Sequence, residues 1–400
     1  MAAELAAEVR TDDESRGAAE LMTMVDCPLL RTTQNTATDY WNDSCSIEEL
    51  VYAIERGATG ATSNPGIVFE VMMKEKAYWF PRVHELAAAN PAWTELDLTW
   101  AVVEEMAVRG ASILRPVFDR EGGRKGRLSI QTNPTNHPNV ERMVEQGVYL
   151  AGLAPNIQVK FPVTAAGVTA IEEATARGAV ITGTVVFTVA QALAVAEAVE
   201  RGLKRREQAG EDVLSMKPVC AIMIGRLDDW MRVLVELDNI VIDPTAVNWA
   251  GIAVFKRAYS IYRERGYRTR LLAAAYRHRL HWTELVGGDV ILTITHQWQT
   301  RFNASGIEPV ARIDDPVDGA IIAELLERIP DFRRAYEAEG LTPAEFDTYG
   351  ATRNTLRSFI KSYYDLMGAV RDLILPDPSV RVSGDYASAA PLPVSPRRSL

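Results

Sequence analysis

The chain has 400 residues, of which 47% are hydrophobic and 24% are charged, an ordinary globular balance that predicts a large buried core. The formal net charge is -10 and there is no long basic run, which argues against nucleic acid or an anionic membrane as the main partner. The three cysteines form no CxxC pair and no zinc-type Cys/His spacing, as expected in a reducing cytoplasm. The N-terminus is acidic and no stretch reaches the length of a membrane span, so we expect a cytoplasmic protein.

In chain order, the sequence divides into three parts. Residues 1–25 are predicted to form a polar arm, residues 26–376 a single domain, and residues 377–400, with several Pro, Ser and Gly, a flexible tail. Within the central part, short apolar runs alternate with longer amphipathic stretches. The runs predict eight strands: Ala37–Trp41, Thr59–Thr62, Arg127–Gln131, Asn156–Lys160, Val180–Thr184, Pro218–Met223, Leu272–Tyr276 and Asp289–Ile294.

Helical patterns separate these strands. Val189–Lys204 and Ala246–Arg263 have helical periodicity, and Ala77–Phe118 is predicted to be helical between strands two and three. A further helical region extends from Pro316 to about Leu373, after strand eight. Alternating strands and helices imply a parallel sheet, and eight such units suggest a closed barrel. We therefore predict the α/β class, as a (β/α)8 TIM barrel with extra helices at the N- and C-terminal ends.

Polar residues stand at the ends of the predicted strands, where barrel enzymes place their reactive groups. Lys160 is the most informative, because it ends the run NIQVK and alternates with the apolar Val159 and Phe161. If its side chain points into the barrel, desolvation lowers the pKa of the amine, and a neutral amine attacks carbonyl groups. A strand-end lysine that extends into solvent is the ordinary alternative. The other strand-end residues are Asp43, Asn64, Gln131, Thr184, Arg226 and Arg277.

Six segments, in order along the chain, resemble motifs of the transaldolase family, which works through a Schiff base and is related to the fructose-6-phosphate aldolase subgroup. Gly57–Val68 contains Thr-Ser-Asn-Pro, and Asn156–Thr164 resembles the N-x-x-x-K-x-P-x-T-x-x-G block that holds the family's lysine. The resemblance covers about Thr33 to Leu366. The remaining segments are Trp41–Ser44, Gly183–Gln191, Gly225–Asp228 and Ala275–Arg277.

The resemblance implies a role for each strand-end residue. Lys160 would form the imine with the donor ketose, and Asp43 would exchange a proton with the C4 hydroxyl during carbon–carbon cleavage and addition. Thr184 would orient the water of imine formation and hydrolysis. The residues implied to bind the substrate are Asn64 for the dihydroxyacetone unit, and Arg226 and Arg277 for the phosphate.

Three of these residues, Asp43, Asn64 and Thr184, also have structural interpretations. Asp43 can cap the helix expected near Ser46. Asn64, which precedes a proline, can be a turn residue, and Thr184 can be an ordinary β-branched strand residue.

The basic residues have surface interpretations. Arg226 can pair with Asp228 or Asp229, and Arg277 lies in a basic cluster with Arg279. The histidines show no metal-ligand spacing, so we expect no metal or organic cofactor and interpret them as structural or surface residues: His84, His137, His278, His281 and His296.

The sequence departs from the family at several positions. Gln131 stands where the family has a catalytic glutamate, and a glutamine orients a water without accepting its proton. Related sugar-phosphate aldolases carry a glutamine there too. Met223 stands where those aldolases have a tyrosine and transaldolases a phenylalanine. Phosphate-binding serines are replaced by Ala221 and Ala275, and an asparagine by Thr182, which we retain as a substrate-binding candidate.

The expected function is that of a transaldolase-type transferase, which moves a dihydroxyacetone unit between ketose and aldose phosphates through a Schiff base on Lys160, as in the pentose phosphate pathway. The departures favour an alternative, an aldolase-like relative acting on a non-standard sugar or carbonyl substrate in a specialised pathway. A non-catalytic barrel used for binding is the third hypothesis. Phosphorylated sugars are the expected partners, and the resemblance allows a homodimer.

Overall fold

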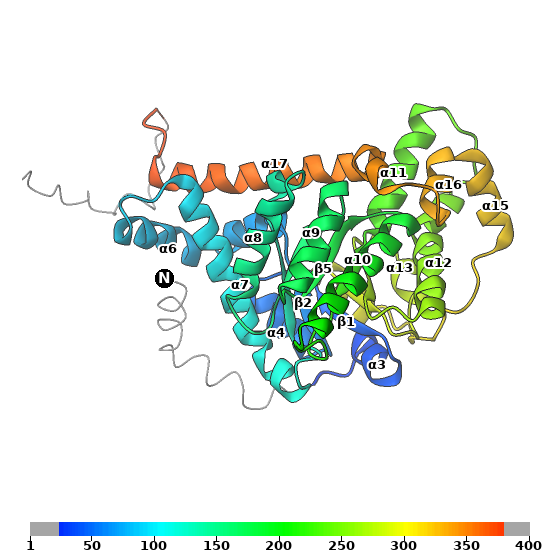
Figure 1. Ribbon diagram of the computed structural model, residues 1–400, viewed down its shortest axis with the longest axis horizontal. Helices are drawn as coiled ribbons and strands as arrows, with labels where there is room; N and C mark the ends of the chain where they lie inside the picture. Colours follow the sequence, from blue (N-terminus) through cyan, green and yellow to red (C-terminus); the bar gives the residue numbers. More distant parts are fainter. Residues whose placement is uncertain (1–23, 380–400) are drawn as a thin grey trace, which may run out of the picture.

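The computed structural model describes residues 24–379, in which eight parallel strands close into a barrel in chain order (Figure 1). Apart from Arg270, every strand residue is buried, because side chains fill the inside of the barrel and helices cover its outside. All eight predicted strands and the (β/α)8 class are confirmed. The strands are β1 (Asp39–Asn42), β2 (Gly60–Thr62), β3 (Arg127–Gln131), β4 (Ile157–Pro162), β5 (Ile181–Val186), β6 (Val219–Ile222), β7 (Arg270–Ala273) and β8 (Ile291–Ile294).

Helices follow each strand and surround the barrel (Figure 1). Several begin at a side-chain cap. The Thr188 side chain, for example, accepts a hydrogen bond from the backbone of Gln191 at the start of α10. The helices between strands are α4 (Ile47–Ile54), α5 (Pro65–Lys74), α6 (Lys76–Ala89), α7 (Glu95–Arg120), η2 (Pro134–Asn136), α8 (Val140–Ala151), α9 (Ala165–Ala176), α10 (Val189–Gln208), α11 (Ile224–Leu237), η3 (Ala246–Trp249), α12 (Ala250–Arg265) and α13 (Leu280–Thr283).

Two boundaries differ from the sequence prediction for identifiable reasons. The long helical stretch after β2 is broken, because Thr94 forms a capping box with Asp97 and starts α7 as a separate helix. Strand β7 ends at Ala273 rather than Tyr276. Ala275 adopts a left-handed conformation, with φ of 69°, which turns the chain out of the sheet.

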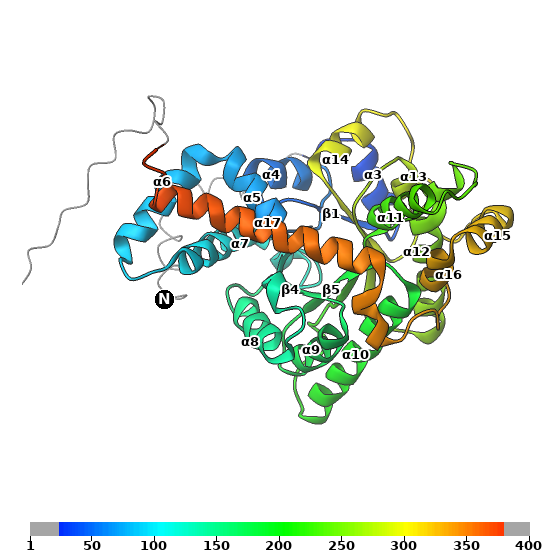
Figure 2. The ribbon, with the colours of Figure 1, turned by 90° about the horizontal axis from the view of Figure 1, so that it is seen from above.

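Extra helices flank the barrel at both ends of the described chain, as predicted. Helix α3 (Pro28–Asn35) precedes β1. The long helix α17 crosses the barrel in the view from above and packs against α5 and α7 (Figure 2). The helices after β8 are α14 (His296–Asn303), α15 (Gly319–Arg328), α16 (Pro330–Tyr336), η4 (Pro343–Thr348) and α17 (Gly350–Ile374).

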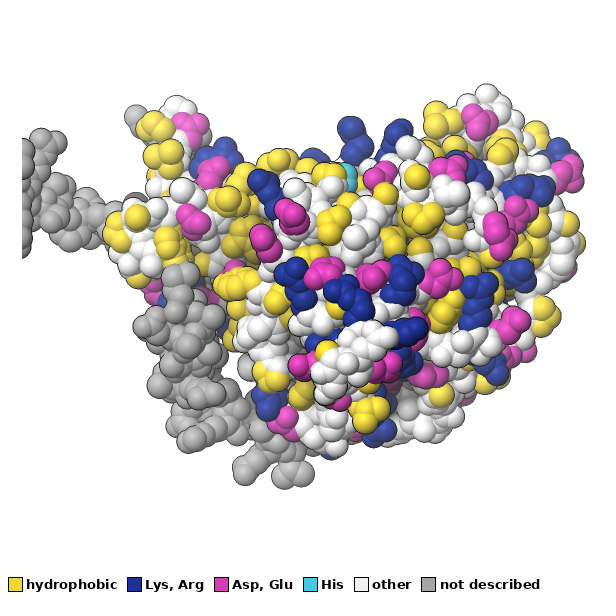
Figure 3. All heavy atoms as spheres, viewed as in Figure 1, with side chains coloured by type: hydrophobic (Ala, Val, Ile, Leu, Met, Phe, Trp, Pro, Cys, Tyr) yellow, Lys and Arg dark blue, Asp and Glu magenta, His cyan; other side chains and the backbone are white. Residues whose placement is uncertain are grey.

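The surface over the central helices carries charges of both signs. Figure 3 shows basic and acidic side chains interspersed on this face. Ion pairs such as Arg201–Glu172, at 2.6 Å, and Arg205–Glu173, at 2.9 Å, join α10 to α9 there. Along residues 24–379, no helix combines the length and apolar character needed to cross a membrane.

The predicted division of the chain into an arm, a single domain and a tail stays a prediction. The arm at residues 1–25 and the tail at residues 377–400 lie outside the described residues, except for residues 24–25 and 377–379. The single domain predicted over residues 26–376 contains the closed barrel and its flanking helices.

Candidate active site

A cavity of about 610 Å³ lies at the carboxyl ends of the strands, beneath α17. Its lining combines strand-end residues with Ser358, Phe359 and Ser362 of α17. Six of the predicted site residues line this cavity: Asp43, Asn64, Lys160, Thr184, Arg226 and Arg277.

Lys160 belongs to β4, in which all six residues are buried. Its side chain is also buried, and its Nζ donates a hydrogen bond to the backbone oxygen of Ser63 at 2.9 Å. Burial lowers the pKa of this amine to about 8, although the charge of Asp43 acts in the opposite direction. A substantial fraction of the amine is therefore neutral near pH 8. The solvent-exposed alternative for this lysine does not apply.

Asp43 follows β1 directly, and its backbone N–H donates to the oxygen of Ile294 on β8 at 3.0 Å. Burial raises the pKa of its carboxyl group, while Lys160 and a hydrogen bond from Thr62 act to lower it. The helix-cap alternative does not apply either, because the N-cap residue of α4 is Ser46. Asp43 is thus a partly buried carboxylate close enough to Lys160 for their charges to interact.

Two threonines that sequence reasoning missed hold the carboxylate of Asp43. The Thr62 hydroxyl donates to Oδ1 of Asp43 at 2.6 Å. Because its hydrogen is used in this way, Thr62 accepts at its oxygen from Thr293, at 2.5 Å. Strand β2 carries Thr62 and β8 carries Thr293, on either side of β1. The only signal in the sequence was the position of Thr62 beside the Ser-Asn-Pro segment.

Asn64 has a structural role as the N-cap of α5, rather than as the turn residue considered above, and it also lines the cavity. Its Oδ1 accepts hydrogen bonds from the backbone of Gly66 and Ile67, at 2.9 and 3.2 Å, and so caps α5. Among the described residues, its Nδ2 has no hydrogen-bond acceptor, which leaves that donor free for a ligand.

Two predicted site residues lie outside the main cavity. The Thr182 hydroxyl is hydrogen-bonded to Ser129 at 2.8 Å, deeper in the barrel. Gln131 is the register partner of Lys160 on the neighbouring strand β3. Its buried amide lines a separate cavity of about 10 Å³ and has no hydrogen-bond partner among the described residues. That volume is close to the minimum that holds one water molecule.

The two arginines lie on neighbouring elements with different partners. Arg226, near the start of α11, is largely buried, and its guanidinium group stacks over Phe359 of α17 at 5.2 Å. Burial and the charge of Arg277 lower the pKa of Arg226. Arg277 pairs with Asp229 at 2.8 Å. Within the described chain, Arg226 forms no ion pair with Asp228 or Asp229, so the surface ion pair considered for Arg226 does not apply.

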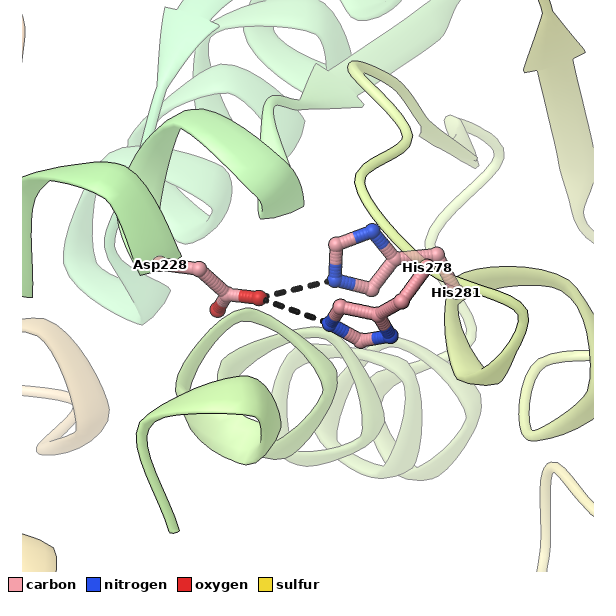
Figure 4. A group of neighbouring side chains, drawn as sticks. All are labelled: Asp228, His278 and His281. Carbon is pink, nitrogen blue, oxygen red and sulfur yellow. Dashed lines mark hydrogen bonds and ion pairs between the residues drawn. The ribbon is translucent and has the colours of Figure 1, made fainter. Parts of the chain in front are cut away.

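Three further titratable side chains meet beside the arginines: Asp228, His278 and His281 (Figure 4). Their potential ligand atoms all lie within 4.8 Å of one another. Sequence spacing gave no sign of this group, because Asp228 and His278 are fifty residues apart in the sequence. The pairing of β6 with β7 brings the two residues together.

A closed (β/α)8 barrel with a polar cavity at the carboxyl ends of its strands is the arrangement of barrel enzymes, and it defines the class of this protein. Residues 40–367 match the family model for transaldolase/fructose-6-phosphate aldolase. The chain belongs to the transaldolase/fructose-6-phosphate aldolase family, as its motifs predicted.

Individual relatives are distant. A transaldolase of Thiobacillus denitrificans is 28% identical over 291 residues, which are 66% of this chain and 79% of that protein. A transaldolase of Mycobacterium ulcerans is 29% identical over 224 residues, 55% of this chain and 58% of that protein. Transaldolase 1 of Streptomyces avermitilis is 30% identical over 247 residues, 59% of this chain and 62% of that protein. The chain thus spans less than two thirds of the last two relatives.

Proposed function

We propose that this chain is a transaldolase-type transferase, which moves a dihydroxyacetone unit between ketose and aldose phosphates. The observation that carries the proposal is the buried amine of Lys160, with a pKa of about 8, in the same cavity as Asp43. Family membership supports the reaction type. The pentose phosphate pathway is the setting in which such an exchange of sugar phosphates is expected.

The reaction begins with the neutral Lys160 amine attacking the ketone carbon of the donor. Loss of water gives a protonated imine, which accepts the electron pair of the C3–C4 bond as that bond breaks. The carboxylate of Asp43 takes the proton of the C4 hydroxyl, and the aldose product leaves. The enamine then adds to the aldehyde carbon of an acceptor, whose oxygen receives the proton from Asp43. Hydrolysis of the new imine releases the product ketose.

Water enters and leaves during the imine steps. Thr184 lines the main cavity, and we assign to it the orientation of that water. The small cavity beside Gln131 is suited to a second, fixed water molecule. Because a glutamine does not accept a proton, Asp43 is the group that transfers protons in these steps.

The donor's dihydroxyacetone end and its anionic end bind to different residues. The free Nδ2 of Asn64 is placed to bind a hydroxyl of the dihydroxyacetone unit, and Arg226 and Arg277 bind the phosphate. Thr182 is left out of this assignment because its hydroxyl is already paired with Ser129.

Trapping with borohydride tests the proposal. Fructose 6-phosphate and sodium borohydride should add a reduced three-carbon label to the Lys160 peptide, as read by mass spectrometry. Lys160→Ala should abolish both labelling and turnover. The matched control Lys204→Ala, at an exposed lysine of α10, should leave both unchanged. A Lys160 peptide that stays unlabelled while the enzyme turns over would refute the Schiff base.

The second candidate is a transaldolase-like aldolase acting on a non-standard sugar or carbonyl substrate. Ala221, Met223 and Ala275 favour it, because they line the cavity with apolar groups where the family carries polar or aromatic ones. Fructose 6-phosphate is supplied with and without erythrose 4-phosphate. Free dihydroxyacetone released without the acceptor favours the aldolase, and exchange that requires the acceptor favours the transferase.

A further inference from the structure

The group formed by Asp228, His278 and His281 takes no part in the proposed reaction, although two of its members, Asp228 and His281, are fully buried (Figure 4). Oδ2 of Asp228 lies 2.9 Å from Nε2 of His281 and 3.2 Å from Nε2 of His278. The side chains of Asp228 and His281 are both 0% exposed. Side chains that are desolvated to this degree need a specific partner for every polar atom.

The hydrogen bonds fix the direction of each contact. Nδ1 of His281 accepts the backbone N–H of Arg277 at 3.1 Å. A neutral imidazole that accepts at Nδ1 carries its proton on Nε2, so His281 donates to Oδ2 of Asp228. The other oxygen of Asp228, Oδ1, accepts the backbone N–H of Gly251 at 2.8 Å.

The protonation states agree with this direction. Burial lowers the pKa of His281, which keeps the ring neutral. Burial by itself would raise the pKa of Asp228, but the hydrogen bonds from His278 and His281 outweigh burial and place that pKa below its ordinary value. Asp228 is therefore an anion that receives hydrogen bonds from two rings and a backbone amide.

The same bonds argue against a metal ion in the group. A cation would need the lone pair of Nε2 on His281, which requires the proton to sit on Nδ1. That proton would then face the N–H of Arg277, and two donors would oppose each other. The arrangement is that of a hydrogen-bond relay from α11 to the loop after β7.

This loop carries Arg277 and is tied to α11 at two further points. Oδ1 and Oδ2 of Asp229 accept from Nε of Arg277, at 3.2 and 2.9 Å. Ala275, with its φ of 69°, places its backbone oxygen where a Cβ on Gly225 would lie 1.7 Å away, so position 225 has to be glycine. The loop and the start of α11, which bears Arg226, are thus packed as one unit.

We propose that Asp228 and His281 are positioning residues that hold the backbone of Arg277, so that Arg226 and Arg277 together bind the anionic end of the substrate. They set the affinity for a phosphorylated sugar and do not act on the reacting carbon atoms. The inference rests on the proposed function, in which these two arginines bind phosphate.

Variants of His281 separate its two hydrogen bonds. His281→Asn keeps an acceptor near Nδ1 for the N–H of Arg277, His281→Gln keeps a donor near Nε2 for Asp228, and His281→Ala keeps neither. We expect His281→Ala to raise the KM for fructose 6-phosphate by about tenfold with kcat within about twofold, and His281→Asn to recover most of the KM. The exposed His84→Ala is the control and should change neither.

Three readouts keep the test independent of folding and of the proposed reaction. Thermal unfolding of each variant shows which of them are folded. Binding of inorganic phosphate, measured by calorimetry, should weaken by about tenfold in His281→Ala and Asp228→Asn and persist in His281→Asn. Reductive trapping with unphosphorylated dihydroxyacetone should label Lys160 equally in the parent and in these variants.

The outcomes distinguish the two proposals. Absence of label on Lys160 in the parent refutes the proposed function, whereas phosphate binding still reports on the positioning role. Equal phosphate affinity in folded parent and His281→Ala proteins refutes the positioning role, and so does a fall in kcat with unchanged KM. Stoichiometric zinc in the parent that is lost in His278→Ala would overturn the hydrogen-bond relay.

Discussion

The environment of Lys160 decides its chemistry at the scale of the single residue. A lysine in water is almost wholly protonated at neutral pH and does not attack carbonyl carbons. Burial in β4 disfavours the charged form, and within residues 24–379 the only hydrogen bond of Nζ goes to the neutral backbone oxygen of Ser63 rather than to a carboxylate. Asp43 is near enough to limit the fall in pKa, so the amine remains poised between its two forms.

We predict that kcat/KM rises with pH around an apparent pKa of about 8. Below this value the folded-state amine is protonated and inactive, and above it the amine is neutral, so activity is lost as pH falls. The raised pKa of Asp43 adds a second loss on the acid side, because its carboxyl group must be ionised to accept a proton. Initial rates with fructose 6-phosphate from about pH 6 to about pH 10 check this. An activity that rises only near the ordinary lysine pKa, about 10.4, would contradict the burial argument.

At the scale of the element, α17 is the part of the chain that completes the site. Phe359 supports the guanidinium group of Arg226, and Ser358 and Ser362, one helical turn apart, line the cavity. Neither serine hydroxyl has a hydrogen-bond partner among the described residues. These hydroxyl groups lie in the same cavity as Ala221 and Ala275, whose side chains offer no hydrogen-bond donor. We infer that the covering helix offers the substrate hydroxyl donors that Ala221 and Ala275 do not provide.

We predict that Ser358→Ala and Ser362→Ala each raise the KM for a phosphorylated ketose by about fivefold, the effect of one hydrogen bond of about 1 kcal/mol. The value of kcat should stay within about twofold, because neither hydroxyl acts on the reacting bond. Steady-state kinetics with fructose 6-phosphate measure both constants. Lys361→Ala is the control, since Lys361 is exposed and pairs with Asp365 on the outer face of α17. Unchanged KM in both serine variants would mean that α17 only covers the cavity.

Across the whole molecule, the two ends of the barrel have different tasks. The carboxyl ends of the strands carry the candidate site, and the opposite end carries an ion-pair network around the buried Asp39. Asp39, at the start of β1, lies 2.7 Å from Nζ of Lys125 and 3.0 Å from Nη1 of Arg270, and Arg270 also pairs with Asp289. This network joins β1 and β7 with the segment before β3.

We predict that Asp39→Ala lowers the free energy of unfolding by about 2 kcal/mol and leaves KM and kcat unchanged. The loss lies below the range for fully buried pairs, because Lys125 and Arg270 are partly exposed and regain solvation. Denaturant titration measures the stability. Asp119→Ala is the matched control, since its pair with Arg115 is half-exposed and should contribute less than about 1 kcal/mol. A large loss of activity in a folded Asp39→Ala protein would contradict the separation of the two ends.

Much of the fold and the centre of the site were predictable from sequence for local reasons. Apolar runs and amphipathic stretches indicate strands and helices through their periods, and eight alternating units indicate a barrel. Because parallel strands place their carboxyl ends together, residues as far apart in sequence as Asp43, Lys160 and Arg226 were expected at one cavity, and they line it. The end of β7 was missed, because Ala275 adopts a left-handed backbone conformation that non-glycine residues adopt only uncommonly and that nothing in the local sequence indicates.

The sequence by itself determined the class of fold and the family, and it predicted the lysine and the carboxylate that line one cavity in the structure. The tertiary structure decided what surrounds them: the threonine pair that holds Asp43, the α17 residues over the cavity, and the relay from Asp228 to the backbone of Arg277. The physical reason is the range of the interactions. Periodicity and motifs act over a few residues, whereas burial and hydrogen bonds between distant segments exist only after the barrel has closed.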